Sequence, residues 1–287
     1  MKKLLYQLDT DALPAVFDNV VGYDGGADHI CAYGGINAGN VAPLVEGAIF
    51  TRGPKDKKNT ALFIGGGNML EGQAVLAAVQ KKFFGKFRVS VMFDCNGSNT
   101  TASAAVAWLA HGRSLKAKRA VVLGGSGPVG QRAAVLLARE GATVSITGRK
   151  LDVVQAACDS IKSRFGVEAR AIEAPTNLER GAAIQGAQIV LATGAAGITL
   201  LEARQWQDSP TLELLADANA SPPAGIGGVG MSDRGALANG KILFGSLGFG
   251  ALKLALHRAC IARLFEQNDL LLDAEEIYAI AKTMVAS

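Results

Sequence analysis

The glycine-rich segment Gly125-Ser126-Gly127-Pro128-Val129-Gly130 constrains the fold more than any other part of the chain. It matches the pattern G-x-G-x-x-G, lies directly after the apolar run Arg119 to Leu123, and opens a helix-like stretch. In this context the glycines permit a tight turn and close backbone approach to a pyrophosphate, while the helix N-terminus offers free N–H groups. The segment predicts a dinucleotide site in a Rossmann-type sheet; an ordinary glycine-rich turn is the alternative.

The turn after the next strand candidate, Thr143 to Thr147, indicates which dinucleotide is preferred. A site selective for NAD carries an aspartate or glutamate there, which binds the ribose 2′-hydroxyl. This chain has Thr147-Gly148-Arg149-Lys150 instead. A hydroxyl, a guanidinium capable of bidentate contacts and an adjacent ammonium suit a 2′-phosphate. We therefore predict NADP, against the alternative of a solvated basic turn with the adenosine bound elsewhere.

A second loop is expected near the nicotinamide. The strand candidate Ile189 to Ala192 is followed by Thr193-Gly194-Ala195-Ala196-Gly197. Loops at the carboxyl ends of strands line the ligand crevice of a doubly wound sheet. Thr193, Gly194 and Ala195 are therefore added to the predicted cofactor site.

Short apolar runs alternate with helical stretches along the chain, which predicts an α/β protein with mainly parallel sheets. We expect an N-terminal α/β domain at residues 1–113, a Rossmann-type doubly wound domain at 114–250, and C-terminal helices at 251–287 that return to the first domain. The run Gly245 to Gly250 is expected to interrupt regular structure before a helix at about Ala251 to Phe265. Further strand candidates are Leu4 to Leu8, Ala61 to Ile64, Arg88 to Phe93, Glu168 to Ala174, Glu213 to Ala216 and Lys241 to Phe244.

Composition excludes several classes of protein. Hydrophobic residues make up 49% and charged residues 19% of the 287, as in a folded globular chain. The net charge of +4 comes without a dense basic stripe, which argues against nucleic-acid binding. The sequence contains no apolar run of roughly 18 residues and no leader-like start, so we expect a cytoplasmic protein without a membrane span. Its four cysteines are scattered, which predicts reduced thiols and no metal site.

Four residues outside the glycine turn are candidates for the substrate site. Lys253 and His257 are four positions apart on a predicted helix and share a face, although the spacing alone favours a solvated lysine and a structural histidine. Thr101 ends the polar run that begins at Asp94, which suits either a helix cap or a ligand site. Phe17 follows the first strand and could stack on a planar ring, although its position alone favours core packing.

Three further segments resemble a known family. Val20 to Ile30, Asn96 to Thr101 and Leu252 to Cys260 look like the corresponding parts of bacterial NADP-dependent methylene-tetrahydromethanopterin dehydrogenases of methylotrophs. The resemblance extends over essentially the whole chain. It implies a fold similar to methylene-tetrahydrofolate dehydrogenases, with an N-terminal pterin-binding domain, a Rossmann domain and a final helix returning to the first domain.

The resemblance also assigns roles to individual residues. It places the pterin-contacting aromatic at Phe17, a threonine at Thr101, and the helical lysine and histidine at Lys253 and His257. Arg149 and Lys150 match the 2′-phosphate site of the family, and a homo-oligomer, most simply a trimer, is implied. Ala255 is expected to be a second lysine in close relatives, which leaves open which helical lysine faces the pterin.

The expected activity is reversible hydride transfer from methylene-tetrahydromethanopterin, and possibly also methylene-tetrahydrofolate, to NADP in one-carbon metabolism. A shikimate-dehydrogenase-like NADP oxidoreductase has a similar two-domain plan but needs a lysine–aspartate pair for alcohol oxidation. A regulator that binds NADP without catalysis is the alternative from another class. An assay that compares both pterins with both nucleotides separates these hypotheses.

Overall fold

The computed structural model describes residues 1–286 and divides the chain into two compact units. The first unit consists of Met1–Thr100 together with Leu254–Ile280. The second unit consists of Thr101–Lys253 together with the residues from Ala281 onward. The amino-terminal and carboxyl-terminal parts of the sequence thus build one unit jointly, and the middle of the sequence builds the other.

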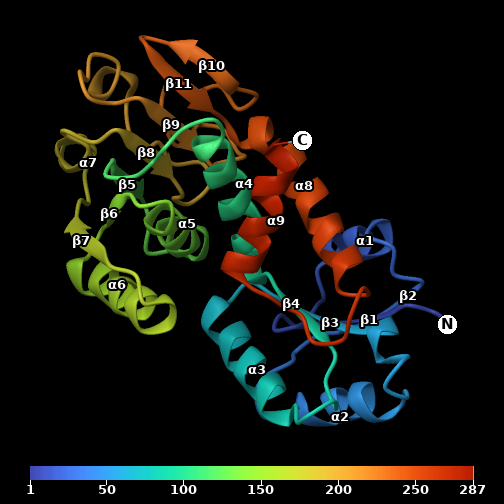
Figure 1. The fold of residues 1–287 in the computed structure, drawn as a ribbon. Helices are drawn as coiled ribbons and strands as arrows, with labels where there is room; N and C mark the ends of the chain where they lie inside the picture. Colours follow the sequence, from blue (N-terminus) through green and yellow to red (C-terminus); the bar gives the residue numbers. More distant parts are fainter. Residues whose placement is uncertain (287) are drawn as a thin grey trace. The chain divides into compact units, whose positions relative to one another are not determined.

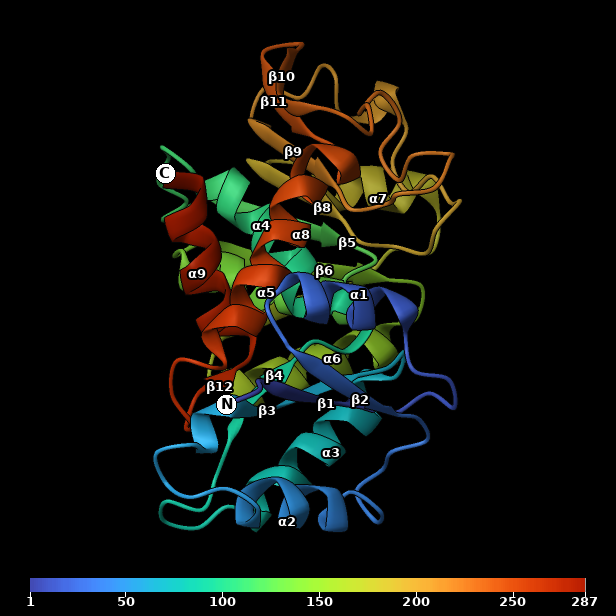
Figure 2. The same ribbon diagram turned by 90° about the vertical axis from the view of Figure 1, so that its right-hand side faces the viewer.

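The first unit is organised around a parallel sheet of five strands in the order β12-β4-β3-β1-β2 (Figure 2). The chain moves from β1 to β2 on one side and then returns to add β3 on the other side. The strand order therefore reverses between β1 and β3, and ligands of open α/β sheets bind at the carboxyl ends of strands at such a reversal. The strands are β1 (Leu4–Asp9), β2 (His29–Tyr33), β3 (Thr60–Gly65), β4 (Ser90–Phe93) and β12 (Leu271–Leu272).

The two faces of this sheet differ in chemistry. Helices α2 (Ala42–Phe50) and α3 (Met69–Lys82) cover one face and bury an aliphatic core against Leu8 and Ile64 (Figures 1 and 2). On the other face, where α1 (Val16–Asp24) lies, the buried Gln7 lies beside the apolar Leu5. A buried amide beneath a helix is notable, because apolar packing alone does not require it.

The second unit has a sheet of seven strands in the order β10-β11-β9-β8-β5-β6-β7, in which every strand but β10 runs parallel to its neighbours. This order confirms the predicted Rossmann-type doubly wound sheet, with its reversal between β5 and β8. The strands are β5 (Arg119–Leu123), β6 (Thr143–Gly148), β7 (Ala169–Glu173), β8 (Ile189–Ala192), β9 (Leu214–Asp217), β10 (Arg234–Ala238) and β11 (Lys241–Phe244).

Helices α5 (Pro128–Arg139), α6 (Leu151–Phe165) and α7 (Asn177–Ala183) connect these strands. Three helices carry residues of both units: α4 (Ser98–Ala110), α8 (Ser246–Arg263) and α9 (Ala274–Ala286). In the first unit, Arg258 on α8 pairs with Asp24 at 2.6 Å and β12 pairs with β4. These contacts confirm the predicted return of the C-terminal segment to the first part of the chain.

The expected break at Gly245 to Gly250 is wrong, because α8 already begins at Ser246. The glycines are required by close packing within the second unit. A Cβ at Gly248 would lie 1.8 Å from the carbonyl oxygen of Asp233, and one at Gly245 would lie 2.0 Å from that of Gly230. Glycines at these positions therefore allow the backbone near Gly230 and Asp233 to pack closely against them, and they do not end the helix.

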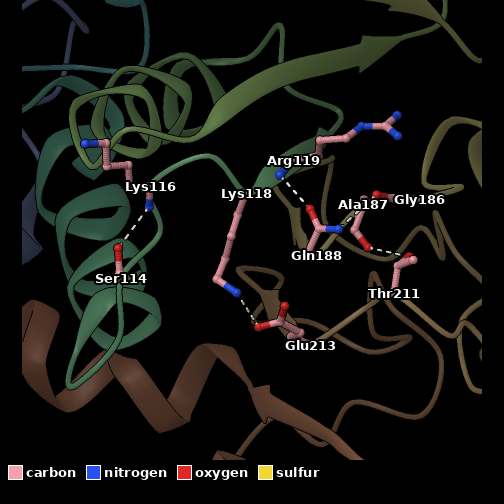
Figure 3. A network of polar contacts seen from close by, with 9 residues as sticks. All are labelled: Ser114, Lys116, Lys118, Arg119, Gly186, Ala187, Gln188, Thr211 and Glu213. Carbon is pink, nitrogen blue, oxygen red and sulfur yellow. Dashed lines mark hydrogen bonds and ion pairs between the residues drawn. The ribbon is translucent and has the colours of Figure 1, made fainter.

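Hydrogen bonds connect the segments directly before β5, β8 and β9, at the amino ends of these strands (Figure 3). Lys118 Nζ donates to Glu213 Oε2 at 2.5 Å, and the backbone N–H of Arg119 donates to Gln188 Oε1 at 2.7 Å. Thr211 Oγ1 donates to the Ala187 carbonyl at 3.0 Å. This end of the sheet is opposite the glycine turn. Its basic residue Lys118 forms an ion pair with Glu213.

Within residues 1–286, no helix is both long and apolar enough to span a bilayer. The same part of the chain contains no group of three or more histidine, cysteine, aspartate or glutamate side chains placed to hold a metal ion.

Candidate active site

The glycine turn joins β5 to α5 at the reversal point of the second sheet. Gly124 has a left-handed backbone with φ +66°, and Gly127 is the N-cap residue of α5. The N–H of Gly125 donates to the Thr147 carbonyl at 2.9 Å, which fixes the turn against the end of β6. Proline at the first helical position suits the helix start because its missing N–H has no partner there in any helix.

The glycines of this turn serve different purposes. A Cβ at Gly130 would lie 2.5 Å from Gly125 Cα, and one at Gly125 would lie 2.8 Å from Ile146 Cβ. By contrast, a Cβ at Gly127 would meet nothing closer than the Gly124 carbonyl oxygen at 3.8 Å. The protein itself therefore does not require glycine at position 127. The open space above Gly127, at a helix N-terminus, fits the close approach of a pyrophosphate.

The residues predicted to bind the 2′-phosphate at the end of β6 differ in their exposure. Arg149 and Lys150 are exposed and follow the strand, as expected for a phosphate site. Thr147 is buried, and its Oγ1 accepts the N–H of Gly124 at 3.2 Å, which holds the glycine turn against the end of β6. Ser126 Oγ lies 3.4 Å from the Cβ position of Gly148, which places this hydroxyl at the same strand end.

The loop after β8 lies against the glycine turn, as its position in the sequence suggests. The Thr193 N–H and hydroxyl donate to the Leu123 carbonyl at 2.9 and 3.1 Å. A Cβ at Gly124 would be 2.8 Å from Gly194 Cα, so the two loops pack backbone to backbone. Ala195 is exposed at the open side of this joint.

At the end of β9, Asp217 begins a loop that follows a strand of the doubly wound sheet. Its carboxylate accepts the N–H groups of Asn219 and Ile226, both at 3.0 Å. Burial raises the pKa of the Asp217 carboxyl, and the backbone donors oppose that effect. An aspartate ending a buried strand was the available signal, and its role here is to fold the following loop.

In the first unit, the structure brings Phe17 and His257 together. Their ring centroids are 6.2 Å apart, and the imidazole also stacks on Phe63 of β3 at 5.3 Å. His257 is fully buried, whereas Phe17 is 49% exposed. Phe17 therefore packs beside the buried imidazole and keeps part of its surface exposed.

Lys253 and Thr101 belong to the second unit, each at the point where a helix passes between the units. Lys253 lies one turn before His257 on α8, and both Lys253 and Thr101 are half-buried. The polar run before Thr101 is mainly a cap. Asp94 accepts the N–H of Asn99 at 2.8 Å and the hydroxyl of Thr100 at 2.7 Å.

The carboxyl ends of β1 and β3 carry further polar groups that sequence reasoning did not single out. Asp9 is fully buried and accepts the N–H groups of Asp11 and Ala15, both at 2.9 Å. Asp11 in turn accepts the N–H of Gly67 at 2.9 Å. These bonds join the loops after β1 and β3 at the reversal point of the first sheet. A charged residue ending a buried strand was again the available signal.

Comparison with known proteins identifies the family. Residues 16–96 match the N-terminal domain of methylene-tetrahydromethanopterin dehydrogenases. Over 99% of both chains, the sequence is 56% identical to the bifunctional protein MdtA of Methylorubrum extorquens. It is also 32% identical, over 98% of both chains, to the NAD(P)-dependent methylenetetrahydromethanopterin dehydrogenase of that organism. The chain belongs to the methylene-tetrahydromethanopterin dehydrogenase family. The resemblance seen in the sequence is thereby confirmed.

The fold of this chain is also similar to solved structures of more distant enzymes. Quinate dehydrogenase from Corynebacterium glutamicum, in complex with NAD, superposes with a TM-score of 0.57 at 14% identity and covers 100% of this chain and 99% of its own. The 5-ketofructose reductase of a Gluconobacter strain gives a TM-score of 0.53 at 17% identity and covers 99% of both chains. These likenesses establish that this methylene-tetrahydromethanopterin dehydrogenase family member has a two-sheet dehydrogenase fold.

Proposed function

We propose that this protein is an NADP-dependent methylene-tetrahydromethanopterin dehydrogenase that also accepts methylene-tetrahydrofolate. The observation that carries the proposal is the open space at Gly127, beside the basic strand end at Arg149, in a chain that aligns with two family members over its whole length. The second unit is assigned to the nucleotide and the first unit to the pterin. In terms of the sequence, residues 1–113 and 251–287 serve the pterin and residues 114–250 serve NADP, so Thr101 and Lys253 are assigned to the pterin although they belong to the second unit.

The reaction needs little acid–base chemistry. The methylene carbon lies between two nitrogens, so loss of hydride leaves a cation that both nitrogens share, and no proton has to leave. When bound, NADP supplies the hydride acceptor, C4 of its nicotinamide. The protein then contributes mainly by positioning, since the donor carbon and the acceptor have to approach within about 3–3.5 Å.

The residues of the proposed site have distinct tasks. Phe17 offers its exposed ring to the pterin or its aryl group, and His257 keeps that ring in place. Thr101 holds the substrate by hydrogen bonding. Lys253 binds a polar group of the pterin, away from the carbon where positive charge develops, because a cation beside that carbon would oppose the reaction.

The residues proposed to hold NADP are those of the turn and of the loops around it. Gly127 admits the pyrophosphate, Ser126, Arg149 and Lys150 take the 2′-phosphate, and the loop from Thr193 borders the nicotinamide. Thr147 contributes by fixing Gly124.

A single assay tests the function. Purified protein is mixed with each methylene-pterin and with NADP or NAD, and the absorbance of the reduced nucleotide is followed. Reduction with a methylene-pterin is expected, and faster with NADP. Reduction with shikimate instead would favour the related alcohol dehydrogenases, and absence of reduction with tight NADP binding would favour a regulator.

Arg149→Ala is expected to weaken NADP binding by roughly 10–100-fold and NAD binding hardly at all, because only the 2′-phosphate loses charge-assisted hydrogen bonds. Titration calorimetry with both nucleotides measures the change. Lys118→Ala is the matched control, since this cation pairs with Glu213 at the far edge of the same sheet. Equal losses for NADP and NAD would remove Arg149 from the site.

We also propose that the enzyme is cytoplasmic, where its nucleotide is found, and that it is a homo-oligomer. A trimer is expected from the resemblance to its family. Multi-angle light scattering at micromolar concentration would give about three times the chain mass of 29.6 kDa. A value near the chain mass would contradict the oligomer.

A further inference from the structure

Arg180 on α7 is a buried cation that binds two separate loops of the second unit. The residue is 9% exposed. Its Nε donates to the carbonyl of Leu200, in the loop after β8, at 2.6 Å. Its Nη1 donates to the carbonyls of Ala174 and Pro175, directly after β7, at 3.3 and 2.8 Å. One guanidinium therefore holds the loop after β7 and the loop after β8 together.

The contact with Leu200 leads to the glycine turn. A Cβ at Gly194 would lie 2.6 Å from Leu200 Cδ1, and one at Gly124 would lie 3.5 Å from the same atom. Leu200 thus packs where the loop after β8 meets the glycine turn. Its own N–H donates to the carbonyl of Gly225 at 2.8 Å. A shift of Leu200 would therefore disturb the loop that is proposed to border the nicotinamide.

The contact with Ala174 leads to the residues proposed for the 2′-phosphate. The N–H of Ala174 donates to the carbonyl of Gly148 at 2.8 Å. Gly148 ends β6 and comes directly before Arg149 and Lys150. The contacts of Arg180 therefore extend toward both ends of the proposed cofactor site.

The helix that carries Arg180 begins with hydrogen bonds of its own. The N–H of Thr176 donates to Glu179 Oε2 at 2.8 Å, and the N–H of Glu179 donates to Thr176 Oγ1 at 3.3 Å, which forms a capping box. The acceptors of Arg180 are uncharged: three carbonyls in the two loops and the amide oxygen of Asn177. A buried cation costs free energy unless its donors are satisfied. Burial of Arg180 thus depends on how the two loops are placed.

Hydride transfer tolerates little displacement of the nicotinamide, because the reacting atoms have to be aligned at close distance. We propose that Arg180 is a positioning residue that fixes the loop after β8 relative to the end of β6, an inference that rests on the proposed function. Arg180 thereby sets where the nicotinamide lies once the 2′-phosphate is bound. A planar guanidinium suits this task because its five N–H donors bind carbonyls on two sides at once.

The test uses adenosine 2′,5′-bisphosphate, the part of NADP that carries the 2′-phosphate and lacks the nicotinamide. Arg180→Met is expected to lower kcat with methylene-tetrahydromethanopterin and NADP by about 10–100-fold. Titration calorimetry of the same variant should give an affinity for the fragment within about twofold of that of the natural chain. Arg149→Ala should show the opposite pattern and weaken the fragment as much as NADP, because it loses contacts to the 2′-phosphate itself.

Lys241→Met is the matched control for the loss of a buried cation in the same unit. Lys241 is 5% exposed, and its Nζ donates to the carbonyls of Gln207 and Asn239, both at 2.9 Å. It begins β11, at the end of the sheet opposite the glycine turn. Thermal unfolding should show lower stability for both methionine variants, since each leaves carbonyls without their donor. Only Arg180→Met should also lower kcat.

Full kcat in a folded Arg180→Met enzyme, or a marked loss of its affinity for the fragment, would overturn the role of Arg180 alone. An equal fall of kcat in Lys241→Met would do the same. If Arg180→Met does not fold, Arg180→Lys decides, because one ammonium nitrogen cannot bind both loops. Its kcat should fall with fragment affinity unchanged, and full kcat would overturn the inference. A natural chain that binds neither NADP nor the fragment would contradict the proposed function itself.

Discussion

Gly127→Ala is expected to fold like the natural chain and to lose about 100-fold in NADP affinity. The new methyl group would meet no protein atom closer than 3.8 Å, and the backbone at this position is extended, with φ −76° and ψ 172°, which alanine adopts freely. The methyl group would instead occupy the space proposed for the pyrophosphate. Overpacking of that kind costs about 1–3 kcal/mol, and the upper end corresponds to the stated loss.

Gly130→Ala is the matched control three residues away. Its methyl group would lie 2.5 Å from Gly125 Cα and 2.6 Å from Thr193 Oγ1, so it should lower the stability of the fold by about 1–3 kcal/mol. Thermal unfolding and calorimetric NADP titration of both variants separate the two effects. If Gly127→Ala destabilises the protein while NADP still binds tightly, the open space has no part in nucleotide binding.

Lys253→Ala is expected to lower kcat/KM for methylene-tetrahydromethanopterin by about 100-fold with NADP affinity nearly unchanged. The loss corresponds to a charge-assisted contact with the pterin in the transition state, at about 2–3 kcal/mol. If Lys253 binds the pterin and transfers no proton, the effect should not vary between about pH 6 and 8. Initial rates at several pH values measure both quantities.

Lys162→Ala controls for the general loss of a helical lysine. Lys162 is exposed on α6 and pairs with Glu168 at 2.9 Å, which raises its own pKa and lowers that of the glutamate. An exposed pair of this kind contributes little, so activity should stay within about twofold. Full pterin activity in Lys253→Ala would remove the residue from the site. A loss that follows a neutral titration would restore an acid–base role.

Secondary structure could be predicted from the sequence where a local residue pattern determines it. β5, β8 and β11 begin and end where their apolar runs do, and the turn between β5 and α5 lies where the glycine pattern places it. The family and the doubly wound class of the second sheet could also be predicted, because the βαβ pattern and the distinctive segments are contiguous in the chain. The first sheet could be predicted only in part. Strand β2 is short, lies at an edge and mixes exposed with buried residues, so it lacks an apolar run.

Other parts of the site depend on contacts between distant residues. Thr147 follows the expected motif, yet its hydroxyl faces Gly124, a pairing set by the packing of two strands. The hydrogen bonds of Gln7 and Asp9 to Ala15 depend on which face of β1 meets α1. The glycines at positions 245 and 248 suggest a break in the sequence, and only the nearby carbonyls of Gly230 and Asp233 explain why they lie at a helix start.

The way the first unit is assembled determines when it can be completed during synthesis. Its sheet gains its edge strand only when Leu271 and Leu272 pair with β4, and Ser90 Oγ donates to the carbonyl of Gln267, 177 residues later in the chain. The Rossmann sheet, by contrast, is contiguous and is complete once Phe244 has left the ribosome. The part of the protein that is translated first therefore finishes folding last. Until then the nascent chain carries an unpaired edge at β4, and an edge of this kind can pair with another chain.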